Sequence, residues 1–295
     1  MTSQTCDSTD SGSQTSLRQS LLAATCVVVK VGTNVLLDDQ GALIPSVLAE
    51  LSASIARLRQ AGRDVVLISS GAIAAGAHRL GLDYRQQRGA CAAAGQSLLT
   101  TAYQHQLGQH GHQIAQILVT SDDFLDPVRA GGLGDTIRQL LQLGIIPLIN
   151  ENDAVSHHVS TAATRLFQDN DQLAALITRL LAVRSLILLT NVDGLYTLDP
   201  AHHQAELISE LNAVTDEHLD NAVLVGPRGR GGMKAKLLAV EQALEEPALV
   251  AVIANGRRPG ILDQIFAGAA VGTVIARREP GRSSMFGESR AIIPS

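Results

Sequence analysis

Residues 165–176, which read RLFQDNDQLAAL, place two carboxylates, Asp169 and Asp171, on either side of Asn170. Like charges at this spacing repel, so other groups must compensate for them. One interpretation is a helix N-cap, because Asp and Asn are preferred there and acidic groups favour the positive end of the helix dipole. The other interpretation is a catalytic site. The residues that the fold brings next to the triplet decide between the two.

Polar residues also follow several apolar runs that are typical of buried strands. Each set is ordinary when taken alone, because a single lysine at a strand end is more often a solvated charge, and Ser, Gly, Asn and Asp are common in turns and caps. The carboxyl ends of parallel strands, however, form the ligand-binding edge of an α/β sheet. Taken together, the polar sets indicate one crevice. The four polar sets are Lys30-Val31-Gly32-Thr33-Asn34, Ser69-Ser70-Gly71-Ala72, Asn150-Glu151-Asn152-Asp153 and Thr190-Asn191-Val192-Asp193-Gly194.

Such a crevice offers Gly-rich turns whose amides can approach phosphate, and two candidate lysines, Lys30 and Lys236. It also offers carboxylates that could hold Mg²⁺ or position the lysines. This set suits phosphoryl transfer, in which catalysis is largely positioning plus charge neutralisation. The sequence contains no GxxxxGK[ST] motif and no protein-kinase Gly-rich loop or HRD and DFG motifs. A phosphotransferase of another class is therefore indicated.

The elements that would position these residues alternate between strands and helices. This order predicts an α/β fold with a mainly parallel sheet covered on both faces, and one domain. Strands are predicted at 26–32, at the start of 64–77, and at 113–119, 145–153, 185–196, 248–256 and 272–276. Helices are predicted at 46–62, at the end of 64–77, at 89–110, 135–144 and 231–246, and directly after the acidic triplet.

The composition narrows the class of protein. The 295 residues are 45% hydrophobic but only 2% aromatic, as expected of Val/Ile strands covered by Ala/Leu helices. The net charge is −5 and no Lys/Arg stripe interleaves with aromatics, so nucleic acid is not an expected partner. Cys6, Cys26 and Cys91 lack CxxC spacing, which disfavours zinc sites and disulfides and favours a cytoplasmic location. No apolar run reaches about 18 residues, so no membrane span is expected.

Two further features favour ordinary structural interpretations. Residues 1–20 are expected to form a polar tail, because 1–16 are rich in Ser, Thr and Gln and lack the basic start and apolar core of a signal peptide. The pairs His157-His158 and His202-His203 are expected in surface loops. Adjacent residues of an extended segment point to opposite faces, so neither pair is expected to bind one metal ion.

Seven segments occur in an order that resembles the amino-acid kinase superfamily, over roughly residues 26–276. They are VVVKVGTNVL, VVLISSGAIAAG, AAAGQ, IIPLINENDAV, QDNDQLAAL, LILLTNVDGLYTLDP and GRGGMKAKLLAV. SSGAIAAG, INENDAV and GLYTLDP together are similar to the members that phosphorylate glutamate. The resemblance implies a three-layer αβα sandwich that transfers the γ-phosphoryl group of ATP to the side-chain carboxylate of L-glutamate, the first step of proline biosynthesis.

The resemblance also implies a division of the chain and a set of partners. The kinase domain is expected over 21–280, with an N-terminal amino-acid-binding lobe, a C-terminal ATP-binding lobe and a tail at 281–295. No PUA domain is expected before the last residue, Ser295. ATP and Mg²⁺ are the implied cofactors and L-glutamate the implied substrate. Homo-oligomerisation and feedback inhibition by proline are implied as well.

Carried over residue by residue, the resemblance implies roles for individual side chains. Lys30 and Lys236 would flank the migrating phosphoryl group, and Asp169 would hold their ammonium groups in place. Asp171 would help to organise Mg²⁺ and the lysines. Substrate contacts are implied for Ser70, Gly71, Asn170 and Asp153, the last as partner of the α-ammonium group. Contacts with ATP are implied for Lys30, Gly32, Thr190, Asn191, Arg230, Gly231, Gly232, Met233 and Lys236.

The chain departs from the family pattern at four places. Gln168 precedes the triplet where members usually have Gly, and Asn191 stands where they usually have Asp. Arg228 and Arg230 occupy a segment that tends to be a Thr-Gly-Gly turn, which would bring more positive charge to the phosphates. Residues 131–134, expected to be a loop, lack the usual Asn-Ala-Arg.

Two alternatives stay open. The first is a sibling kinase that acts on acetylglutamate, aspartate, carbamate, UMP or a related acyl acceptor, against which INENDAV and SSGAIAAG argue. The second is a catalytically weak relative that binds a nucleotide or an amino acid. The presence of Lys30, Lys236, Asp169 and Asp171 argues against it, because a pure binding protein has little need of paired lysines.

Overall fold

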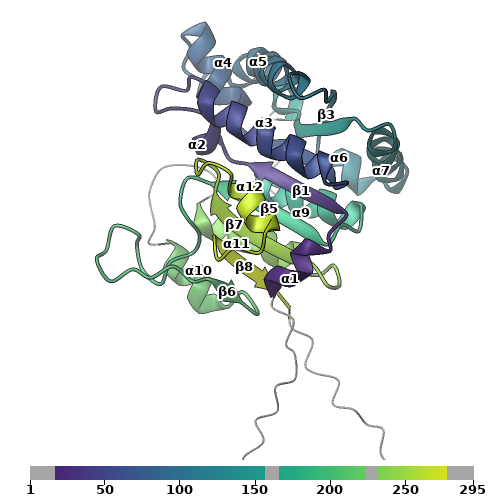
Figure 1. Ribbon diagram of the computed structural model, residues 1–295. Coiled ribbons are helices and arrows are strands. Elements are labelled where there is room, and N and C mark those ends of the chain that lie inside the picture. Colours follow the sequence, from purple (N-terminus) through teal and green to yellow (C-terminus); the bar gives the residue numbers. More distant parts are fainter. Residues whose placement is uncertain (1–16, 157–165, 224–231, 278–295) are drawn as a thin grey trace, which may run out of the picture.

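The computed structural model describes residues 17–156, 166–223 and 232–277, whose strands form one eight-stranded sheet (Figure 1). The strand order is β3-β4-β2-β1-β5-β7-β8-β6. Every neighbouring pair is parallel except β7 and β8, which are antiparallel. The strands are β1 (Cys26–Val31), β2 (Asp64–Ser69), β3 (Ile114–Val119), β4 (Ile146–Glu151), β5 (Ser185–Thr190), β6 (Glu210–Leu211), β7 (Val250–Asn255) and β8 (Thr273–Ala276).

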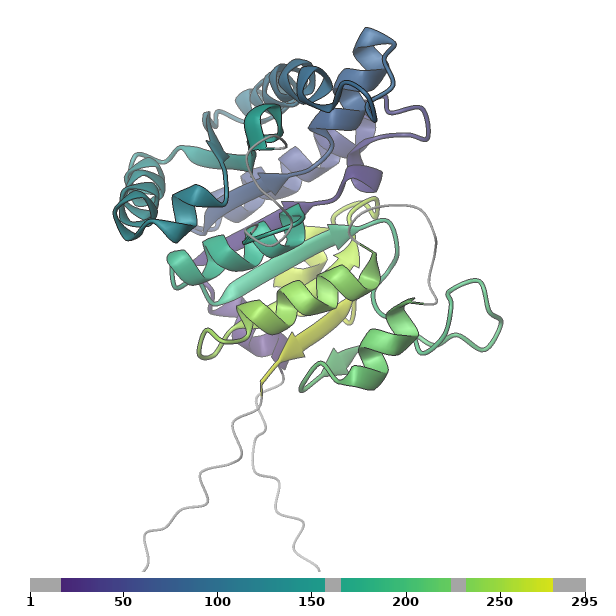
Figure 2. The same cartoon turned by 180° about the vertical axis from the view of Figure 1, so that it is seen from behind.

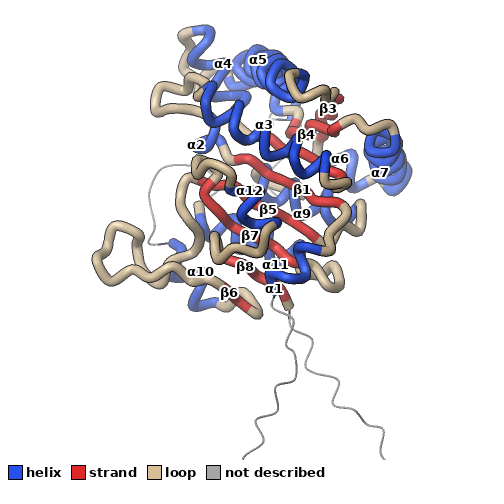
Figure 3. The backbone as a smooth tube through the Cα atoms, viewed as in Figure 1, coloured by secondary structure: helices blue, strands red, loops and turns tan. Residues whose placement is uncertain are grey.

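Helices cover both faces of the sheet, so that the strands lie in the middle layer, as Figure 3 shows. One face packs against α1 (Leu17–Leu22), α3 (Pro45–Gln60), α5 (Arg88–Gly108) and α12 (Ile261–Phe266). The other packs against α7 (Pro127–Gln142), α9 (Asn170–Leu180) and α11 (Met233–Ala243), seen from behind in Figure 2. The remaining helices are α2 (Thr33–Leu36), α4 (Ala72–Leu80), α6 (Asp122–Leu125), α8 (Asp153–Ser156) and α10 (Asp216–Val223).

The central strand β1 shows why its sequence is a continuous Val run. Val27 and Val29 belong to the core beneath α3 and α12, whereas Val28 belongs to the opposite core beneath α9 and α11. Successive side chains of a strand point to opposite faces, so a strand covered on both sides needs apolar residues at every position. The expected mainly parallel αβα sandwich is therefore confirmed. None of the helices in the described segments is long and apolar enough to cross a membrane.

The order of the strands brings four polar strand ends together. Strands β4, β2, β1 and β5 are consecutive neighbours and run in the same direction. Their carboxyl ends lie at Glu151, Ser69, Val31 and Thr190. The polar sets that follow these strands in sequence therefore meet at one edge of the sheet, as predicted.

Helix α7 corrects the prediction of a loop at 131–134. The helix begins at Pro127, and residues 131–134 lie within it. Its N-cap, Asp126, accepts hydrogen bonds from the backbone N–H groups of Val128 and Arg129. Proline at the first helical position after an Asp cap is a recognisable start signal. The glycines at 131, 132 and 134 hid this start, because glycine disfavours helix interiors.

Helix α1 moves the boundary of the N-terminal tail. Residues 17–20 were expected in the tail, but they are helical, and Leu17, Arg18 and Leu21 are buried. The Arg18 guanidinium donates hydrogen bonds to the carbonyl oxygens of Ala269 and Val271, at 2.9 and 2.7 Å. Because this side chain joins α1 to a segment 251 positions away, Arg18 is part of the folded domain.

Helices α4 and α5 cross with their backbones in direct contact. A Cβ atom added to Gly76 would lie 1.8 Å from the carbonyl oxygen of Cys91, and one added to Gly95 would lie 1.7 Å from that of Ala72. No other residue type fits at either position without moving a helix. This contact fixes the start of α4, at Gly71 and Ala72, relative to the start of α5 at Arg88.

Candidate active site

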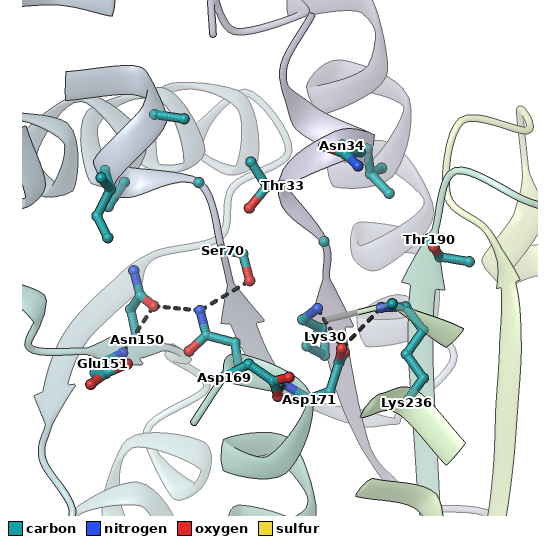
Figure 4. Close-up of a pocket in the computed structure, with 18 of the residues that line it drawn as sticks. Lys30, Thr33, Asn34, Ser70, Asn150, Glu151, Asp169, Asp171, Thr190 and Lys236 are labelled. Carbon is teal, nitrogen blue, oxygen red and sulfur yellow. Dashed lines mark hydrogen bonds and ion pairs between the residues drawn. The ribbon is translucent and has the colours of Figure 1, made fainter. Parts of the chain in front are cut away.

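A cavity of about 640 Å³ opens at the carboxyl ends of β1, β2, β4 and β5 (Figure 4). This size is within the range of small-molecule sites. Its lining contains most of the residues that the sequence singled out. These are Lys30, Gly32, Ser70, Gly71, Asp153, Gln168, Asp169, Asn170, Asp171, Thr190, Asn191, Gly232, Met233 and Lys236. Arg228, Arg230 and Gly231 lie outside the described residues.

At the base of the cavity, one carboxylate holds two ammonium groups, and Figure 4 shows these three side chains converging. Asp171 Oδ1 lies 2.7 Å from Lys30 Nζ, and Asp171 Oδ2 lies 2.9 Å from Lys236 Nζ. Asp171 is fully buried, and Lys30 and Lys236 are 4% and 5% exposed. Lys30 comes from the carboxyl end of β1, Asp171 from the first turn of α9, and Lys236 from the first turn of α11. Three separate elements therefore fix the cluster.

The structure shows that Asp171, and not Asp169, contacts both lysines directly. Asp169, expected to hold the lysines, is the N-cap of α9, and its Oδ1 accepts hydrogen bonds from the backbone N–H groups of Asp171 and Gln172, both at 3.0 Å. Asp171 is the residue that bridges Lys30 and Lys236. A side chain that caps a helix turns back toward the first turn, so it cannot also reach both lysines. The N-cap interpretation of the acidic triplet is confirmed for Asp169, while Asp171 belongs to the lysine cluster on which the catalytic interpretation depends.

The surroundings shift the pKa values of the two acids in opposite directions. Burial raises the pKa of Asp169, and the negative charge of Asp171 adds to the shift. Burial alone would raise the pKa of Asp171 too, but Lys30 and Lys236 outweigh it and hold that pKa below its ordinary value. Burial lowers the pKa of Lys30, although Asp171 opposes the shift. The lysine cluster is therefore electrostatically coupled throughout.

A second group of side chains, all amides and hydroxyls, lies beside the charged cluster. Asn170 Nδ2 donates hydrogen bonds to Ser70 Oγ at 3.0 Å and to Asn150 Oδ1 at 2.9 Å, as drawn in Figure 4. Its Oδ1 is buried and accepts no hydrogen bond from the described residues. A buried acceptor that lines a cavity and lacks a partner is suited to a ligand donor such as an ammonium group. The amide and hydroxyl group thus offers contacts to a polar ligand.

The sequence interpretation missed one cation in the cavity, Arg88. It lies at the start of α5, lines the cavity, and its Nη2 donates a hydrogen bond to Asp153 Oδ1 at 2.5 Å. Asp153 is 6% exposed, at the start of α8. In sequence, Arg88 stands among Arg and Gln residues that resemble an exposed loop. Its place just before the long small-residue helix was the one available signal.

The part of the cavity expected to contact ATP is formed by the end of β5 and the start of α11. Thr190, Asn191, Gly232 and Met233 all line it. The backbone N–H of Gly32, expected near a phosphate, instead donates to the carbonyl oxygen of Leu189 at 3.0 Å. Gly32 is needed for a different reason, because a Cβ atom there would lie 3.1 Å from that oxygen. The backbone N–H of Gly32 therefore bonds to strand β5.

Gln168, which precedes the acidic triplet, is one of the residues that line the cavity. Its side chain is exposed and lines the cavity, while its backbone N–H donates to Gln172 Oε1 at 2.7 Å. This bond resembles a capping box, in which a side chain of the first turn reaches back to the N–H before the helix. Where family members usually have glycine, this chain therefore adds an exposed polar side chain to the cavity lining.

One of the two histidine pairs lies among the described residues. His202 and His203 are exposed, as predicted, but they lie in a turn rather than an extended segment, and their rings stack at 4.7 Å between centroids. His157 and His158 lie outside the described residues. Within the described part of the chain, no group of three or more His, Cys, Asp or Glu residues could hold a metal ion by itself.

This chain resembles one family model and several known proteins. Residues 25–255 match the model of the Amino acid kinase family. A glutamate 5-kinase of Geobacter metallireducens is 41% identical over 265 residues, which cover 88% of this chain and 69% of that relative. Isopentenyl phosphate kinase of T. acidophilum has a TM-score of 0.60 at 16% identity, over 85% of this chain and 100% of that chain. UMP kinase from Bacillus anthracis has a TM-score of 0.57 at 18% identity, over 86% and 96%.

Proposed function

This chain belongs to the amino acid kinase family, and we propose that it transfers the γ-phosphoryl group of ATP to the side-chain carboxylate of L-glutamate. The products are ADP and γ-glutamyl phosphate, and the reaction is the first step of proline biosynthesis. Similarity to the glutamate 5-kinase over 88% of this chain supports the choice of substrate. The geometry of the cavity supports the class of reaction.

One observation carries the proposal: a single buried carboxylate, Asp171, holds two ammonium groups, those of Lys30 and Lys236, at the base of the cavity. Two desolvated cations so close together repel each other and are unfavourable for a protein that only binds a ligand. A migrating phosphoryl group spreads negative charge over three oxygens, which such a pair can neutralise. Because the cations are already in place, they need no reorganisation during the reaction.

In the reaction, a γ-carboxylate oxygen of glutamate attacks the γ-phosphorus of ATP. The new P–O bond forms as the bond to the oxygen shared with the β-phosphorus breaks, and that electron pair leaves with ADP. Lys30 and Lys236 neutralise the charge on the transferring group. No general base is needed, because a glutamate side chain with a pKa of about 4.3 is already ionised at neutral pH.

We assign the protein ligand for Mg²⁺ to Asp169 in place of the sequence expectation, Asp171. Both oxygens of Asp171 are engaged by lysines. Asp169 uses one oxygen as a helix cap, and its Oδ2 accepts no hydrogen bond from the described residues. Mg²⁺ is commonly held by one or two carboxylates plus substrate phosphates and water, and when bound it neutralises phosphate charge. That mode fits a cavity without a ready three-residue metal cluster among the described residues.

The amino-acid end supports glutamate as the acceptor. Ser70 and Asn170 supply hydrogen-bonding groups, and Asp153 supplies a carboxylate for the α-ammonium group. Ser70 directly follows β2, Asn170 begins α9 and Asp153 begins α8, and all three line the cavity. A substrate that spans the cavity thus has its γ-carboxylate at the lysines and its α-carbon groups near Asp153.

Trapping of the acyl phosphate tests the function directly. The protein is incubated with ATP, Mg²⁺, L-glutamate and hydroxylamine, and γ-glutamyl hydroxamate and ADP are measured together. We expect both to form in equal amounts and only when glutamate is present. A complete lack of glutamate-dependent hydroxamate at every Mg²⁺ concentration would refute the proposal. Hydroxamate formed faster from N-acetyl-L-glutamate or L-aspartate would select the sibling kinase instead.

A further inference from the structure

The amino-acid end of the cavity contains an ion pair that sequence reasoning did not assign, Arg88 with Asp153. Resting on the proposed function, we propose that Arg88 determines specificity by binding the α-carboxylate of the amino-acid substrate, next to the α-ammonium partner Asp153. Arg88 takes no part in the phosphoryl transfer itself. The pair thereby selects an α-amino acid over other compounds that carry a γ-carboxylate.

The first argument is the distribution of positive charge. Among the described residues that line the cavity, the cationic side chains are Lys30, Lys236 and Arg88. Both lysines are bound to Asp171 at the buried base, where the phosphoryl group passes. L-Glutamate carries two carboxylates, and the one that is not phosphorylated also needs a cation when it is desolvated. Arg88 is the described cavity cation that remains for it.

The second argument is the hydrogen-bonding capacity of the guanidinium. Arginine has five N–H donors in a planar fork that matches a carboxylate in a two-bond geometry. The only hydrogen bond from the Arg88 side chain to a described residue is the one from Nη2 to Asp153. Its side chain is 22% exposed, so the other donors are accessible from the cavity. A second carboxylate can therefore join without displacing Asp153.

The third argument is complementarity to a zwitterion. The α-carboxylate and α-ammonium groups of an amino acid are attached to one carbon, so their charges are adjacent and opposite. Arg88 and Asp153 present adjacent and opposite charges in return. The Oδ1 atom of Asn170, buried and without a partner among the described residues, is an additional acceptor for the ammonium group. Each charge of the head group thus finds an opposite charge or an acceptor.

The fourth argument concerns position. The backbone contact between Gly76 and Gly95 joins α4 and α5, and these helices begin with Gly71 and Arg88 at the cavity. Arg88 is thereby fixed relative to the Ser70 turn. A cation exposed on the surface and surrounded by water would not require a helix start that is held in place in this way.

The test compares two substrates that differ only in the group that Arg88 is proposed to bind. L-Isoglutamine has the γ-carboxylate and α-ammonium of glutamate, but its α-carboxylate is an uncharged amide. In the Arg88→Met variant we expect kcat/KM for L-glutamate to fall roughly 10- to 100-fold, as for the loss of a hydrogen bond to a charged group. The value for L-isoglutamine should stay within about 3-fold, and KM rather than kcat should carry the glutamate loss.

Two further variants separate specificity from structure. Arg88→Lys keeps the charge but loses the fork, so its preference for glutamate should lie between those of the native protein and Arg88→Met. Arg85→Met removes an exposed arginine from the same segment, outside the cavity lining, and should leave both substrates unchanged. If the native protein turns over isoglutamine too slowly to measure, competition against glutamate gives the same ratio.

The outcomes also separate this inference from the proposed function. Equal losses for both substrates in Arg88→Met would overturn it, because Arg88 would then only position Asp153 or support the fold. An unchanged KM for glutamate would overturn it as well. In both cases the native protein would still form glutamate-dependent hydroxamate. A native protein that forms none refutes the proposed function itself.

Discussion

The two ends of the cavity bind charge in different ways. At the end proposed for phosphoryl transfer, Lys30, Asp171 and Lys236 are almost completely buried, and both lysines contact Asp171. At the end proposed for the amino acid, Arg88 is partly exposed, and its carboxylate partner, Asp153, lies in the first turn of α8. The first cluster is positioned by the carboxyl end of β1 and the first turns of α9 and α11, whereas the second is positioned by the starts of α5 and α8.

The difference reflects what each end must do. Neutralising a transferring phosphoryl group is most effective where water is excluded, because charges interact more strongly at low dielectric. Recognising a small zwitterion needs access from solvent and charges that can exchange one partner for another. We therefore expect substitutions at the buried end to affect turnover and stability, and substitutions at the accessible end to affect substrate affinity.

The largest effect is expected from Lys236→Ala. We expect turnover to fall roughly 10³-fold or more, as for loss of a group that stabilises transition-state charge, with glutamate binding nearly unchanged. Hydroxamate formation measures turnover, and calorimetry measures glutamate binding. Lys234→Ala, on the same helix but outside the cavity lining, is the matched control and should keep native activity. A comparable loss of glutamate affinity in Lys236→Ala would show that the two ends are not separate.

The second prediction concerns the stability of the buried end. Asp171→Asn leaves two buried ammonium groups without their carboxylate, so the free energy of unfolding should fall by about 3–5 kcal/mol. Denaturant unfolding measures this change. Asp135→Asn removes an exposed carboxylate that pairs with Arg138, and it should change stability by at most about 1 kcal/mol. Similar values for the two variants would contradict the structural role of the lysine cluster.

The pH dependence of this stability has a defined sign. The folded-state pKa of Asp171 lies below the value of about 3.9 for an unfolded Asp. Its contribution to stability is therefore fully present above about pH 5 and is lost as pH falls through the folded pKa. The difference in Tm between the native protein and Asp171→Asn should be constant from neutral pH to about pH 5 and narrow below about pH 4. A difference that widens on acidification would contradict the ion pairing.

The third prediction concerns the accessible end. Asp153→Ala should chiefly raise KM for L-glutamate, by roughly 10- to 100-fold, because it removes the carboxylate proposed for the α-ammonium group. The KM for ATP should change little. Steady-state kinetics with each substrate varied in turn measures both values. An unchanged KM for glutamate would remove Asp153 from the amino-acid site.

The smallest effect is expected from Gln168→Gly. The side chain is exposed and contacts the helix start through its backbone N–H, a group that glycine retains. We expect KM and kcat for both substrates to change by no more than about 3-fold, in line with an exposed polar side chain. A larger change would mean that the Gln168 side chain reaches a substrate.

The sequence predicted the sheet well, because buried parallel strands have a simple signature. The runs around Val28, Val66, Ile149, Leu188 and Val252 have consecutive buried apolar residues that point to both faces, as strands covered on both faces require, and their polar residues are confined to the ends. The two-residue strand β6 was missed, since so short a segment shows no period. Helix α7 was placed eight residues too late, because its three glycines concealed a clear Asp126-Pro127 start.

The sequence predicted which residues line the cavity better than it predicted what each of them contacts. The residues at four strand ends do share one cavity. That Asp169 caps α9 while Asp171 alone contacts both lysines could not be foreseen, because either carboxylate could have been the cap, and only the backbone geometry decides which one is. Arg88 was missed because its partner Asp153 lies 65 residues away, on a different element. Pairings of this kind depend on tertiary structure rather than on local pattern.

The glycine contact between α4 and α5 has a practical consequence for protein engineering. Gly76 and Gly95 bring two helix backbones so close that a single added methyl group on either would overlap a carbonyl oxygen. Randomised libraries aimed at new acceptor substrates should therefore vary Tyr84 and Arg88, which line the cavity, and leave both glycines unchanged. Conversely, a conservative Gly76→Ala change, remote from any reacting atom, would alter substrate preference through displacement of the α5 start. If a selection for new substrates recovered such a variant, the altered preference would come from a shifted helix and not from a new side chain in the cavity.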